Sequence, residues 1–318
     1  AGFSQDTFSI IAVDTITGEI GGAGASCIDD NAITNGVLII NDIIPGRGGI
    51  HTQAYWRPQN QENAHDRMEE GMSPSEIIDW LVENDYQNNP TIRQYGIVDF
   101  DSLGNPRSAA YTGVNCDDYK SHITGPNYAI QGNILLGQEI LDSMEARFLN
   151  TEGMLAEKLM AALQGANVPG ADTRCSGEGV SSLSAFVRVA KTEDTTGTYF
   201  CNLVVPETPY GVEPIDSLQV LFDEWLNFLS VDENQWQNAW LKISPNPVKA
   251  GEVLHLDAYG MHSIGRVELL NQQGARIHVV EKSGKKLQIN TAGLAAGVYI
   301  LKARADDGNT ASFKVIIR

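Results

Sequence analysis

The stretch "TFSIIAVDTITGEIGGAGAS" (residues 7–26) contains two runs of apolar or very small residues separated by a polar segment. The first run, residues 7–13, is almost continuously apolar, which is typical of a strand covered on both faces. The segment "DTITGE" (14–19) has turn chemistry, because Gly18 adopts a positive φ at little cost. The second run, residues 20–26, predicts a strand whose tiny side chains let another backbone or a ligand approach closely.

The rest of the first 230 residues changes from strand-like to helix-like patterns and back. Ser73 and Glu76 have the spacing of a helix-capping box, with Pro74 at the first helical position. Strands before and after the helices predict an α+β domain of two packed sheets with helices outside. The predicted strands include 37–44, 49–55, 93–100, 108–113, 181–190 and 198–205, and the predicted helices 59–71, 73–85 and about 137–165.

The chain is acidic, but its charge is unevenly distributed. The net charge of the 318 residues is −18. Residues 1–242 contain twelve Lys/Arg and 34 Asp/Glu, whereas residues 243–318 contain ten Lys/Arg and six Asp/Glu. An acidic body argues against nucleic-acid binding. It is compatible with head-to-tail attraction between neighbouring chains, although acidity also simply keeps a protein soluble. No apolar run approaches the roughly 18 residues that span a membrane.

The segment "ISPNPVKAG" (243–251) marks a boundary between two sequence patterns. After it, short alternating stretches at about 8–12-residue spacing predict a small β-sandwich. Before it, residues 214–241 look helical and carry an apolar stripe, expected to pack on the body more readily than on another chain. The expected organisation is an extension (1–6), an α+β domain (7–213), a helical connector (214–242) and a β-domain (243–318).

All four cysteines, Cys27, Cys116, Cys175 and Cys201, lie in the acidic body. The absence of a CxxC pair disfavours zinc and redox motifs, and we expect neither a metal nor a cofactor. The first residues, "AGFSQD", are small in the way expected just after a cleaved signal peptide. In a secreted protein an even count suggests two disulfides, with Cys27–Cys116 and Cys175–Cys201 favoured among three connectivities. Buried thiols are the alternative.

The last part of the chain contains "SPNP" (244–247), "VELLNQQGARI" (267–277), "INTAGLAAGVYILKA" (289–303) and the closing "FKVIIR". These stretches resemble the C-terminal sorting domain of the type IX secretion system of Bacteroidetes. The resemblance implies export across the outer membrane, a secreted or cell-surface location, and the secretion machinery as a partner. It also implies that the domain is usually removed after export, whereas this sequence still carries it.

A second set of motifs spans the first 230 or so residues. The motifs are "TFSIIAVD" (7–14), "TGEIGGAGAS" (17–26), "HTQA" (51–54), "GIVDFDSLG" (96–104), "AYTGVNC" (110–116), "YAIQGNILLG" (128–137) and "DTR" (172–174). Together they resemble an uncharacterised bacterial and archaeal family with an Ntn-hydrolase-like fold. The resemblance implies a four-layer αββα sandwich, and it implies amide-bond chemistry only weakly.

By this resemblance Thr7 occupies the position of an N-terminal nucleophile. In such enzymes the side-chain hydroxyl attacks a carbonyl, and the free α-amine takes its proton. Ser26, Gln53 and Asn133 are candidate helpers by motif position, and Asn133 could donate to an oxyanion. Because the amide nitrogen of Thr7 has no usable basic lone pair, the mechanism requires cleavage between Asp6 and Thr7.

Several other residues are weaker candidates. Gln131 is a further helper by motif position, and Asp172 and Arg174 could orient groups or pair with each other. His51 and His65 could act as bases, but a lone histidine is more often structural. Asp99 and Asp101 would suit calcium, although "DFDSLGN" lacks the spacing of an EF-hand and favours a hairpin turn. "PGRGG" (45–49) lacks the Lys-Ser/Thr of a phosphate-binding loop.

Asp-Ser/Thr-aliphatic triplets resemble the O-glycosylation signal of Bacteroidetes secreted proteins and would place glycans on Thr15, Ser102, Ser143 and Ser217.

Two functions from different classes remain open at this point. The favoured one is a structural subunit of a self-assembling extracellular filament or surface layer. Three features support this hypothesis: the charge difference between residues 1–242 and 243–318, the sorting domain, and the edge strands of a terminal β-domain, which a neighbouring chain could pair with. In that hypothesis an ordered extension lies along another subunit, through Ala1, Gly2, Phe3, Ser4, Gln5 and Asp6. The alternative is a secreted amidohydrolase or peptidase that uses Thr7 after residues 1–6 are removed.

Overall fold

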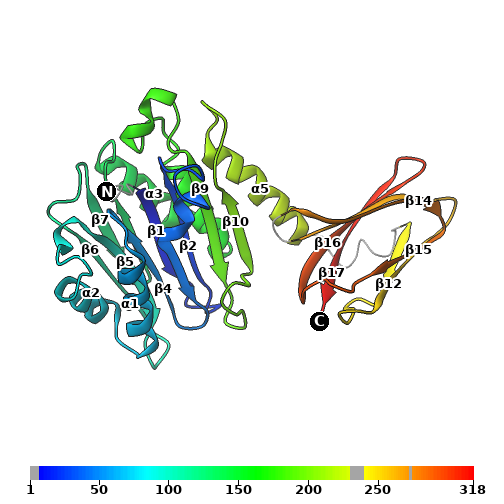
Figure 1. Ribbon diagram of the computed structural model, residues 1–318, viewed down its shortest axis with the longest axis horizontal. Coiled ribbons are helices and arrows are strands. Elements are labelled where there is room, and N and C mark those ends of the chain that lie inside the picture. The colour runs from blue at the N-terminus through cyan, green and yellow to red at the C-terminus, as the bar shows by residue number, and fades with distance from the viewer. Residues whose placement is uncertain (1–6, 230–239, 272–273) are drawn as a thin grey trace. The chain divides into compact units, whose positions relative to one another are not determined.

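A computed structural model of the chain describes residues 7–229, 240–271 and 274–318 (Figure 1). The chain divides into two compact units, Ala1–Phe222 and Asp223–Arg318, which are described separately below. The extension 1–6, predicted to contact another subunit, lies outside the described residues. Within the described ranges, no helix is long and apolar enough to cross a membrane.

A six-stranded antiparallel sheet forms the centre of the N-terminal unit. β1 (Thr7–Val13) pairs on one side with β2 (Ile20–Ser26) and on the other with β8 (Tyr128–Gly132). The two strands predicted from residues 7–26 are therefore confirmed, and both are fully buried. The strand order is β10-β9-β2-β1-β8-β7, with β7 at Ser121–Gly125, β9 at Ser184–Ala190 and β10 at Cys201–Val205.

A second, four-stranded sheet is an antiparallel meander. It runs in the order β3-β4-β5-β6, and "PGRGG" forms the hairpin connection between β3 and β4. Two helices contact this sheet, and the second begins with the predicted capping box, since the Ser73 side chain accepts from Glu76 N. The bounds are β3 Asn41–Ile44, β4 Gly48–Gln53, β5 Gln94–Phe100, β6 Pro106–Thr112, α1 Pro58–Glu69 and α2 Pro74–Glu83.

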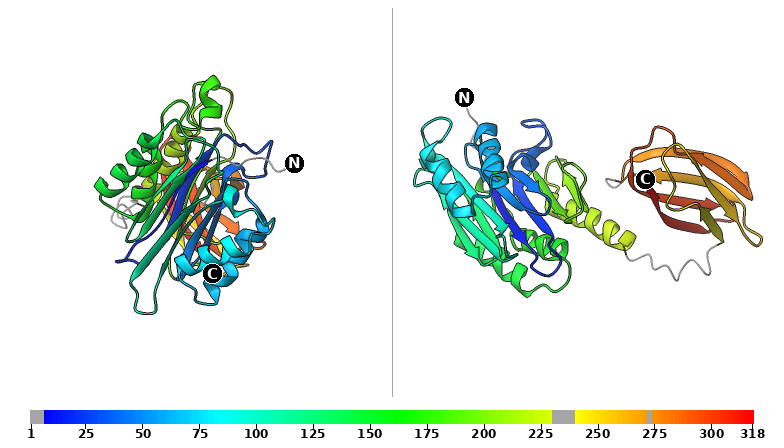
Figure 2. Two further views of the ribbon diagram at one scale, coloured as in Figure 1. Left: turned by 90° about the vertical axis from the view of Figure 1, so that its left-hand side faces the viewer. Right: turned by 90° about the horizontal axis from the view of Figure 1, so that it is seen from below.

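The two sheets of this unit pack face to face, with β1 and β8 against β4 and β5. Helices α3 (Gln138–Asn150) and α4 (Leu155–Gly165) contact the six-stranded sheet, and α1 and α2 contact the four-stranded one. Figure 2 shows the two helix pairs on opposite sides of the strands. The layers therefore run helices, sheet, sheet, helices.

The layer between the sheets is apolar at one end and polar at the other. Toward the end of β1, Ile11 and Val13 belong to an apolar cluster with Val98 of β5. Toward the start of β1, the fully buried side chains of Ser9 and Gln53 replace the aliphatic ones. The start of β1 is thus surrounded by hydrogen-bonding groups, and this end of the sandwich holds the candidate site.

Three local predictions were wrong or incomplete. In the predicted strand 37–44 only residues 41–44 form a strand, β3, whereas the first four residues belong to the 3₁₀ helix η1 (Gly36–Ile40), because an apolar run alone does not distinguish strand from helix. The predicted long helix is two helices, interrupted around Gly153, whose φ is 109°. β7 was not predicted, and its residues alternate between partly buried and exposed. Two further 3₁₀ helices are η2 (Pro90–Ile92) and η3 (Thr173–Glu178).

Helix α5 (Pro214–Leu229) begins within the N-terminal unit, which extends to Phe222. Ile215 and Leu218 are fully buried. Gln164 Nε2 donates to Gln219 Oε1 over 3.2 Å, and Asn167 Nδ2 donates to Asp216 Oδ1 over 2.7 Å. The first turns of the predicted connector therefore form hydrogen bonds with Gln164, in the last turn of α4, and with Asn167, just after α4.

The C-terminal unit contains two antiparallel sheets around an apolar core. The three-stranded sheet has the order β11-β12-β15, and the four-stranded sheet has the order β14-β13-β16-β17. Inward residues such as Leu256, Leu301 and Phe313 form one core cluster, as expected for a β-sandwich. The bounds are β11 Leu241–Ser244, β12 Val253–Ala258, β13 Ile264–Leu270, β14 Arg276–Gly284, β15 Lys286–Asn290, β16 Gly297–Ala305 and β17 Thr310–Ile317.

Candidate functional site at the start of β1

The backbone of Thr7 is held from two sides. Thr7 N donates to the side-chain oxygen Oδ1 of Asn133 over 3.0 Å. In return Asn133 N donates to Thr7 O over 3.2 Å, and Gln53 Nε2 donates to the same carbonyl over 3.0 Å. Since Thr7 is 1% exposed, these contacts fix its backbone in a buried setting. Two of the predicted helpers, Gln53 and Asn133, thus contact Thr7 directly.

The third predicted helper, Ser26, lies opposite Thr7 across the β1–β2 pair. Ser26 is also buried, and paired residues on adjacent strands project to the same face. Its carbonyl accepts a 2.8 Å hydrogen bond from Leu183 N, which connects the end of β2 to the segment before β9. The structure therefore brings together all four residues that the sequence named as catalytic candidates.

A chain of buried polar side chains extends from Gln53 across both sheets. Ser9 Oγ donates to Gln53 Oε1 over 2.7 Å, and Gln53 Nε2 also donates to Gln94 Oε1 over 2.7 Å. Gln131 Nε2 donates to Ser9 Oγ over 2.6 Å. Within the described part of the chain, Gln131 Oε1 is buried without a hydrogen-bond partner. Such a polar network specifies one arrangement strongly, because every unmet buried hydrogen bond costs about 1–3 kcal/mol.

His51 belongs to this network and is a neutral, structural histidine. Its ring is fully buried on β4, with Nε2 2.9 Å from Asn41 Nδ2 and Nδ1 3.4 Å from Gln131 Nε2. Burial disfavours the charged ring and lowers the pKa of His51 to about 3. A methyl group at Gly22 would lie 2.5 Å from His51 Nε2. The small residues of β2 therefore make room for a side chain of the opposite sheet.

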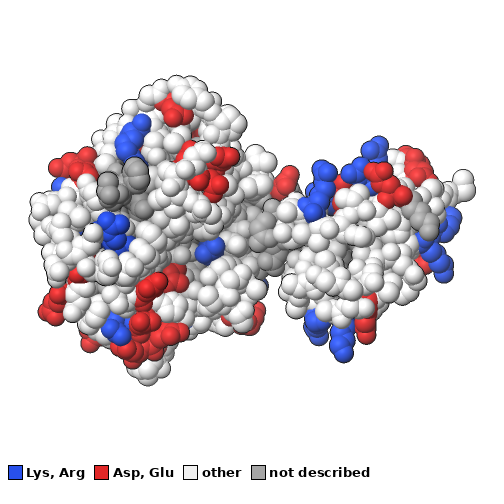
Figure 3. Space-filling view, viewed as in Figure 1, with Lys and Arg blue, Asp and Glu red and all other residues white. Residues whose placement is uncertain are grey.

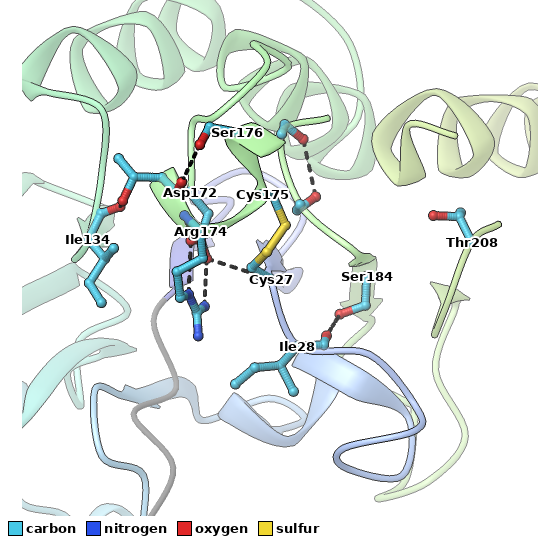
Figure 4. The surroundings of a disulfide bond; sticks show 12 residues. Cys27, Ile28, Ile134, Asp172, Arg174, Cys175, Ser176, Ser184 and Thr208 are labelled. Carbon is cyan, nitrogen blue, oxygen red and sulfur yellow. Dashed lines mark hydrogen bonds and ion pairs between the residues drawn. A yellow bond between two sulfur atoms is a disulfide. The ribbon is translucent and has the colours of Figure 1, made fainter. Parts of the chain in front are cut away.

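Asp172 and Arg174 pair with each other next to the start of β1, one of the two roles considered for them. Arg174 Nε donates to Asp172 Oδ1 over 3.0 Å and Arg174 Nη2 donates to Asp172 Oδ2 over 2.7 Å (Figure 4). Asp172 Oδ2 also accepts from Cys27 N, one residue beyond Ser26. The buried carboxylate thus holds both the end of β2 and the guanidinium group.

A disulfide between Cys27 and Cys175 connects the same two segments, which are 148 residues apart in the sequence. The predicted pairing Cys27–Cys116 with Cys175–Cys201 was wrong. Cys116 is a buried thiol whose Sγ donates to Arg93 O over 3.3 Å. Cys201 is buried on β10, where burial raises the pKa of its thiol. Spacing along the chain cannot decide such a connectivity, because the loops that meet at this site are distant in sequence.

The residues considered for metal binding lie elsewhere, and so does His65, the second histidine considered as a base. Asp99 forms ion pairs with Arg47 over 2.7 Å and with Arg107 over 2.6 Å. Asp101 Oδ1 accepts from Leu103 N and Asn105 N and so closes the hairpin turn. His65 lies on α1 with Nδ1 2.7 Å from Asp42 Oδ2. Among the described residues, no three His, Cys, Asp or Glu side chains form a metal-binding group.

The four glycosylation candidates differ in accessibility. Thr15 and Ser102 lie in exposed turns, followed by Ile16 at 93% and Leu103 at 85% exposure. Ser143 lies within α3 before the fully buried Met144. Ser217 lies within α5, and its Oγ donates to Glu213 O. Accessible turn positions are therefore Thr15 and Ser102, and helix geometry disfavours the other two.

Sequence reasoning did not find the buried polar chain as a unit. Ser9, Gln94 and Asn41 were not named at all, and Gln131 was named only by motif position. Their signal is polar residues at alternate positions of strands that otherwise read as apolar, as in Thr7 and Ser9 or His51 and Gln53. Strand pairing and sheet packing bring these polar residues from separate strands into one buried layer. The sequence of a single strand does not show that they meet.

The fold and sequence of the C-terminal unit define a protein of the secreted or cell-surface class. Residues 242–318 match the model of the secretion system C-terminal sorting domain, which implies interaction with the type IX secretion machinery. Residues 7–215 match the model of DUF1028, described as a family of unknown function. Because this match covers more than half of the sequence, the chain belongs to the DUF1028 family.

A solved structure agrees with the family assignment at the level of fold. The crystal structure of protein SPO2555 from Silicibacter pomeroyi, a DUF1028 protein, is 24% identical in sequence to this chain and superposes with a TM-score of 0.53. The match covers 73% of this chain and 93% of SPO2555. PorZ, an essential surface component of the type IX secretion system of Porphyromonas gingivalis, is 13% identical over 28% of this chain and 12% of PorZ. Its TM-score of 0.22 is too low to carry an argument. No curated protein matches the sequence.

Proposed function

We propose that the α+β domain is a latent amide hydrolase of the N-terminal nucleophile type, with Thr7 as the nucleophile once the residues before it are removed. The observation that carries the proposal is the position of Asn133 Oδ1, 3.0 Å from Thr7 N. Thr7 begins β1, a central strand of the six-stranded sheet, on the face that packs against the four-stranded sheet, and Ser26 and Gln53 lie beside it. The order of layers, helices, sheet, sheet, helices, supports an Ntn-hydrolase-like arrangement.

In this mechanism one residue supplies both nucleophile and base. The α-amine of a newly terminal Thr7 accepts the hydroxyl proton while Oγ1 attacks the amide carbonyl of the substrate. The amine leaving group takes that proton, and water then hydrolyses the acyl ester on Thr7 and releases a carboxylic acid. Asn133 Oδ1 accepts a hydrogen bond from the α-amine and orients it. Nδ2 of the same carboxamide is the donor suited to the oxyanion.

A comparison of two N-termini tests the proposal. One protein starts at Ala1, and the other is released from a fusion so that it starts at Thr7. Both are treated with a β-lactone, which acylates a reactive N-terminal threonine, and with a panel of acyl p-nitroanilides. We expect a covalent adduct on Thr7 only in the Thr7-starting protein, detected by intact mass and peptide mapping.

Side-chain variants separate chemistry from folding in the same experiment. Thr7→Val keeps the shape but lacks the hydroxyl, so it should give no adduct, and Thr7→Ser should keep it. An equal adduct in the Ala1-starting protein would refute the requirement for a free α-amine. A folded Thr7-starting protein without any adduct would refute the nucleophile itself.

A second candidate function is that of a structural subunit in an extracellular filament or surface layer. The observation that favours it is the opposite charge of the two parts of the chain, twelve Lys/Arg against 34 Asp/Glu before residue 243 and ten against six after it. Negative-stain microscopy over a range of salt and protein concentrations tests it. Polymers that disappear when residues 1–6 are deleted would support the extension as the link, and strictly monomeric particles would remove this candidate.

A further inference from the structure

The outer face of the four-stranded C-terminal sheet is basic at one end and apolar at the other. On β16, Lys302 and Arg304 are exposed, whereas Leu301 and Ala303 point into the core. On β17, Lys314 is exposed and lies opposite Ile300. The half-buried Val298 and Ile316 form the next cross-strand pair. We call Lys302, Arg304, Lys314, Val298, Ile300 and Ile316 the basic face.

Lys302 lies opposite Glu268 across the β13–β16 pair and is electrostatically coupled to it, whereas no carboxylate lies opposite Arg304 or Lys314 in the described strand pairs of this sheet. In the described residues of this unit, the ion pairs involve other cations, for example Arg266 with Glu268 and Glu281, and never Lys302, Arg304 or Lys314. Arg304 also lies opposite Arg266 across the β13–β16 pair, and like charges at such positions destabilise a sheet. An exposed sheet face with a net positive charge and adjacent aliphatic side chains suits an acidic protein surface as its partner.

The N-terminal unit carries a surface of complementary character. An open hollow of about 440 Å³ lies between η1, β3 and α1. Its lining includes the carboxylates of Asp42, Glu62 and Asp66 and the apolar Ile39 and Pro58. Figure 3 shows acidic side chains gathered over α1. We call this the acidic hollow, and its mixture of carboxylates and apolar groups matches that of the basic face.

His65 and Arg188 partly balance the negative charge of Asp42 in the hollow. Asp42 accepts from His65, and Glu69 lies 3.6 Å from the other ring nitrogen. Burial disfavours the protonated ring, but the hydrogen bond to Asp42 and the surrounding carboxylates outweigh it and raise the pKa of His65. Within the described ranges, no ion pair includes Glu62 or Asp66. Two long cationic side chains from a partner would therefore meet two carboxylates, Glu62 and Asp66, that form no ion pair within the described residues.

We propose that the basic face of one chain docks onto the acidic hollow of a second copy. The inference rests on the assembly role proposed above and names its contact surfaces. Because the two surfaces differ, the contact is heterologous, and its repetition adds subunits head to tail. Lys302, Arg304 and Lys314 supply the charge complementarity, and Val298, Ile300 and Ile316 supply apolar contact at the edge of the same patch.

Charge reversal in the full chain tests the contact. The face variant carries Lys302→Glu and Arg304→Glu, and the hollow variant carries Glu62→Lys and Asp66→Lys. Light scattering at low salt should show concentration-dependent self-association of the wild type, weakened by about tenfold or more in each variant, since like charges across an interface are repulsive. An equimolar mixture of the two variants should associate again, because each reversed surface finds a complement.

A matched control distinguishes specific docking from a change in net charge. Lys242→Glu with Lys249→Glu alters the net charge as much as the face variant, and both lysines are exposed on the same unit. This control should associate like the wild type. Association that survives the face variant, or that the control abolishes equally, would overturn the proposed surfaces while leaving assembly intact. A strictly monomeric wild type at every salt and protein concentration would overturn the surfaces and the assembly role together.

Discussion

At Thr7, the fold and the proposed chemistry use the same nitrogen atom in two bonding states, as an amide and as an α-amine. As an amide, Thr7 N donates a hydrogen bond to Asn133 Oδ1 and completes the start of β1. As an α-amine, the same atom would keep that hydrogen bond and gain a lone pair that accepts a proton. The position of Asn133 therefore serves both states, and the difference between an inert and a reactive Thr7 is a single peptide bond.

His51 gives the stability of the N-terminal unit a dependence on pH. The ring is neutral in the fold, with its pKa lowered to about 3, and takes up a proton near pH 6.5 when the chain unfolds. Its contribution is therefore complete above pH 6.5 and is lost progressively as the pH falls toward 3, by up to ~1.4 kcal/mol per pH unit. His51→Gln should reduce the slope of unfolding free energy against pH between 6.5 and 4.

Urea unfolding at a series of pH values measures this slope. The comparison is between slopes, so a general loss of stability in the variant does not affect it. Above pH 7 the wild type and His51→Gln should run parallel, because the imidazole is neutral in both the folded and the unfolded chain. Identical slopes below pH 6.5 would contradict the buried, neutral state of His51.

Gly22 tests whether β2 must consist of small residues at this point. A methyl group there would lie 2.5 Å from His51 Nε2 and 2.8 Å from Asn41 Nδ2, both of which are fixed in the buried network. Gly22→Ala should therefore destabilise the unit by about 1–3 kcal/mol, as overpacking does. Gly177→Ala is the control, because a methyl group at Gly177 would have no atom within 4 Å. Equal effects of the two changes in thermal or urea unfolding would contradict the argument.

At the scale of elements, β1 and β2 were predictable because their residues leave few alternatives. A continuous apolar run and a run of glycine and alanine, joined by a turn around Gly18, matched Thr7–Val13 and Ile20–Ser26. The capping box at Ser73 was equally local. The run Gly36–Ile40 was not predictable as a 3₁₀ helix, since its burial against Phe186 is a tertiary contact.

The candidate site also contains residues that the sequence could identify and residues that it could not. Thr7, Gln53 and Asn133 were named from motifs, and the structure shows them in contact. Ser9 and Gln94 were missed because each is a single polar residue in its own strand, and only the packing of the two sheets brings both side chains to Gln53. The disulfide was assigned wrongly because Cys175 reaches Cys27 through η3, whose position depends on the bridge between Leu135 and Asp172.

The Cys27–Cys175 disulfide should stabilise the N-terminal unit substantially. It closes a loop of 148 residues, and removing a native disulfide typically costs about 2–5 kcal/mol. Cys27→Ser with Cys175→Ser should lower the midpoint of urea unfolding and make it insensitive to dithiothreitol. The wild type should respond to the reductant. A variant that unfolds like the oxidised wild type would show that this bond adds nothing to stability.

The exposed turns make a prediction about modification. If the Asp-Ser/Thr-aliphatic triplets are glycosylated in the native host, the glycans should occur on Thr15 and Ser102, because both lie in accessible turns. Ser143 and Ser217 should remain unmodified within their helices. Peptide mapping by mass spectrometry of protein from the culture medium checks all four positions. A glycan on Ser143 would contradict the argument from accessibility.

At the scale of the whole molecule, the sorting domain determines where the protein works. Residues 242–318 match the sorting domain, so deleting them should stop export, and the protein should accumulate inside the cell envelope instead of outside. Immunoblots of cell fractions and medium measure the distribution. Thr7→Val in the full chain is the matched control and should be exported like the wild type. Normal export of the deleted chain would contradict the assignment.

The Cys27–Cys175 disulfide beside the candidate site forms only at a late stage, after synthesis of the chain. Thiols stay reduced in the cytosol, so Cys27 and Cys175 join only after the chain has left it. Until then the segment that carries Asp172 and Arg174 is tied to the end of β2 by hydrogen bonds alone. Protein produced in a reducing cytosol would therefore lack the covalent link between these two segments, and a negative assay on such material would describe a form of the molecule without its disulfide.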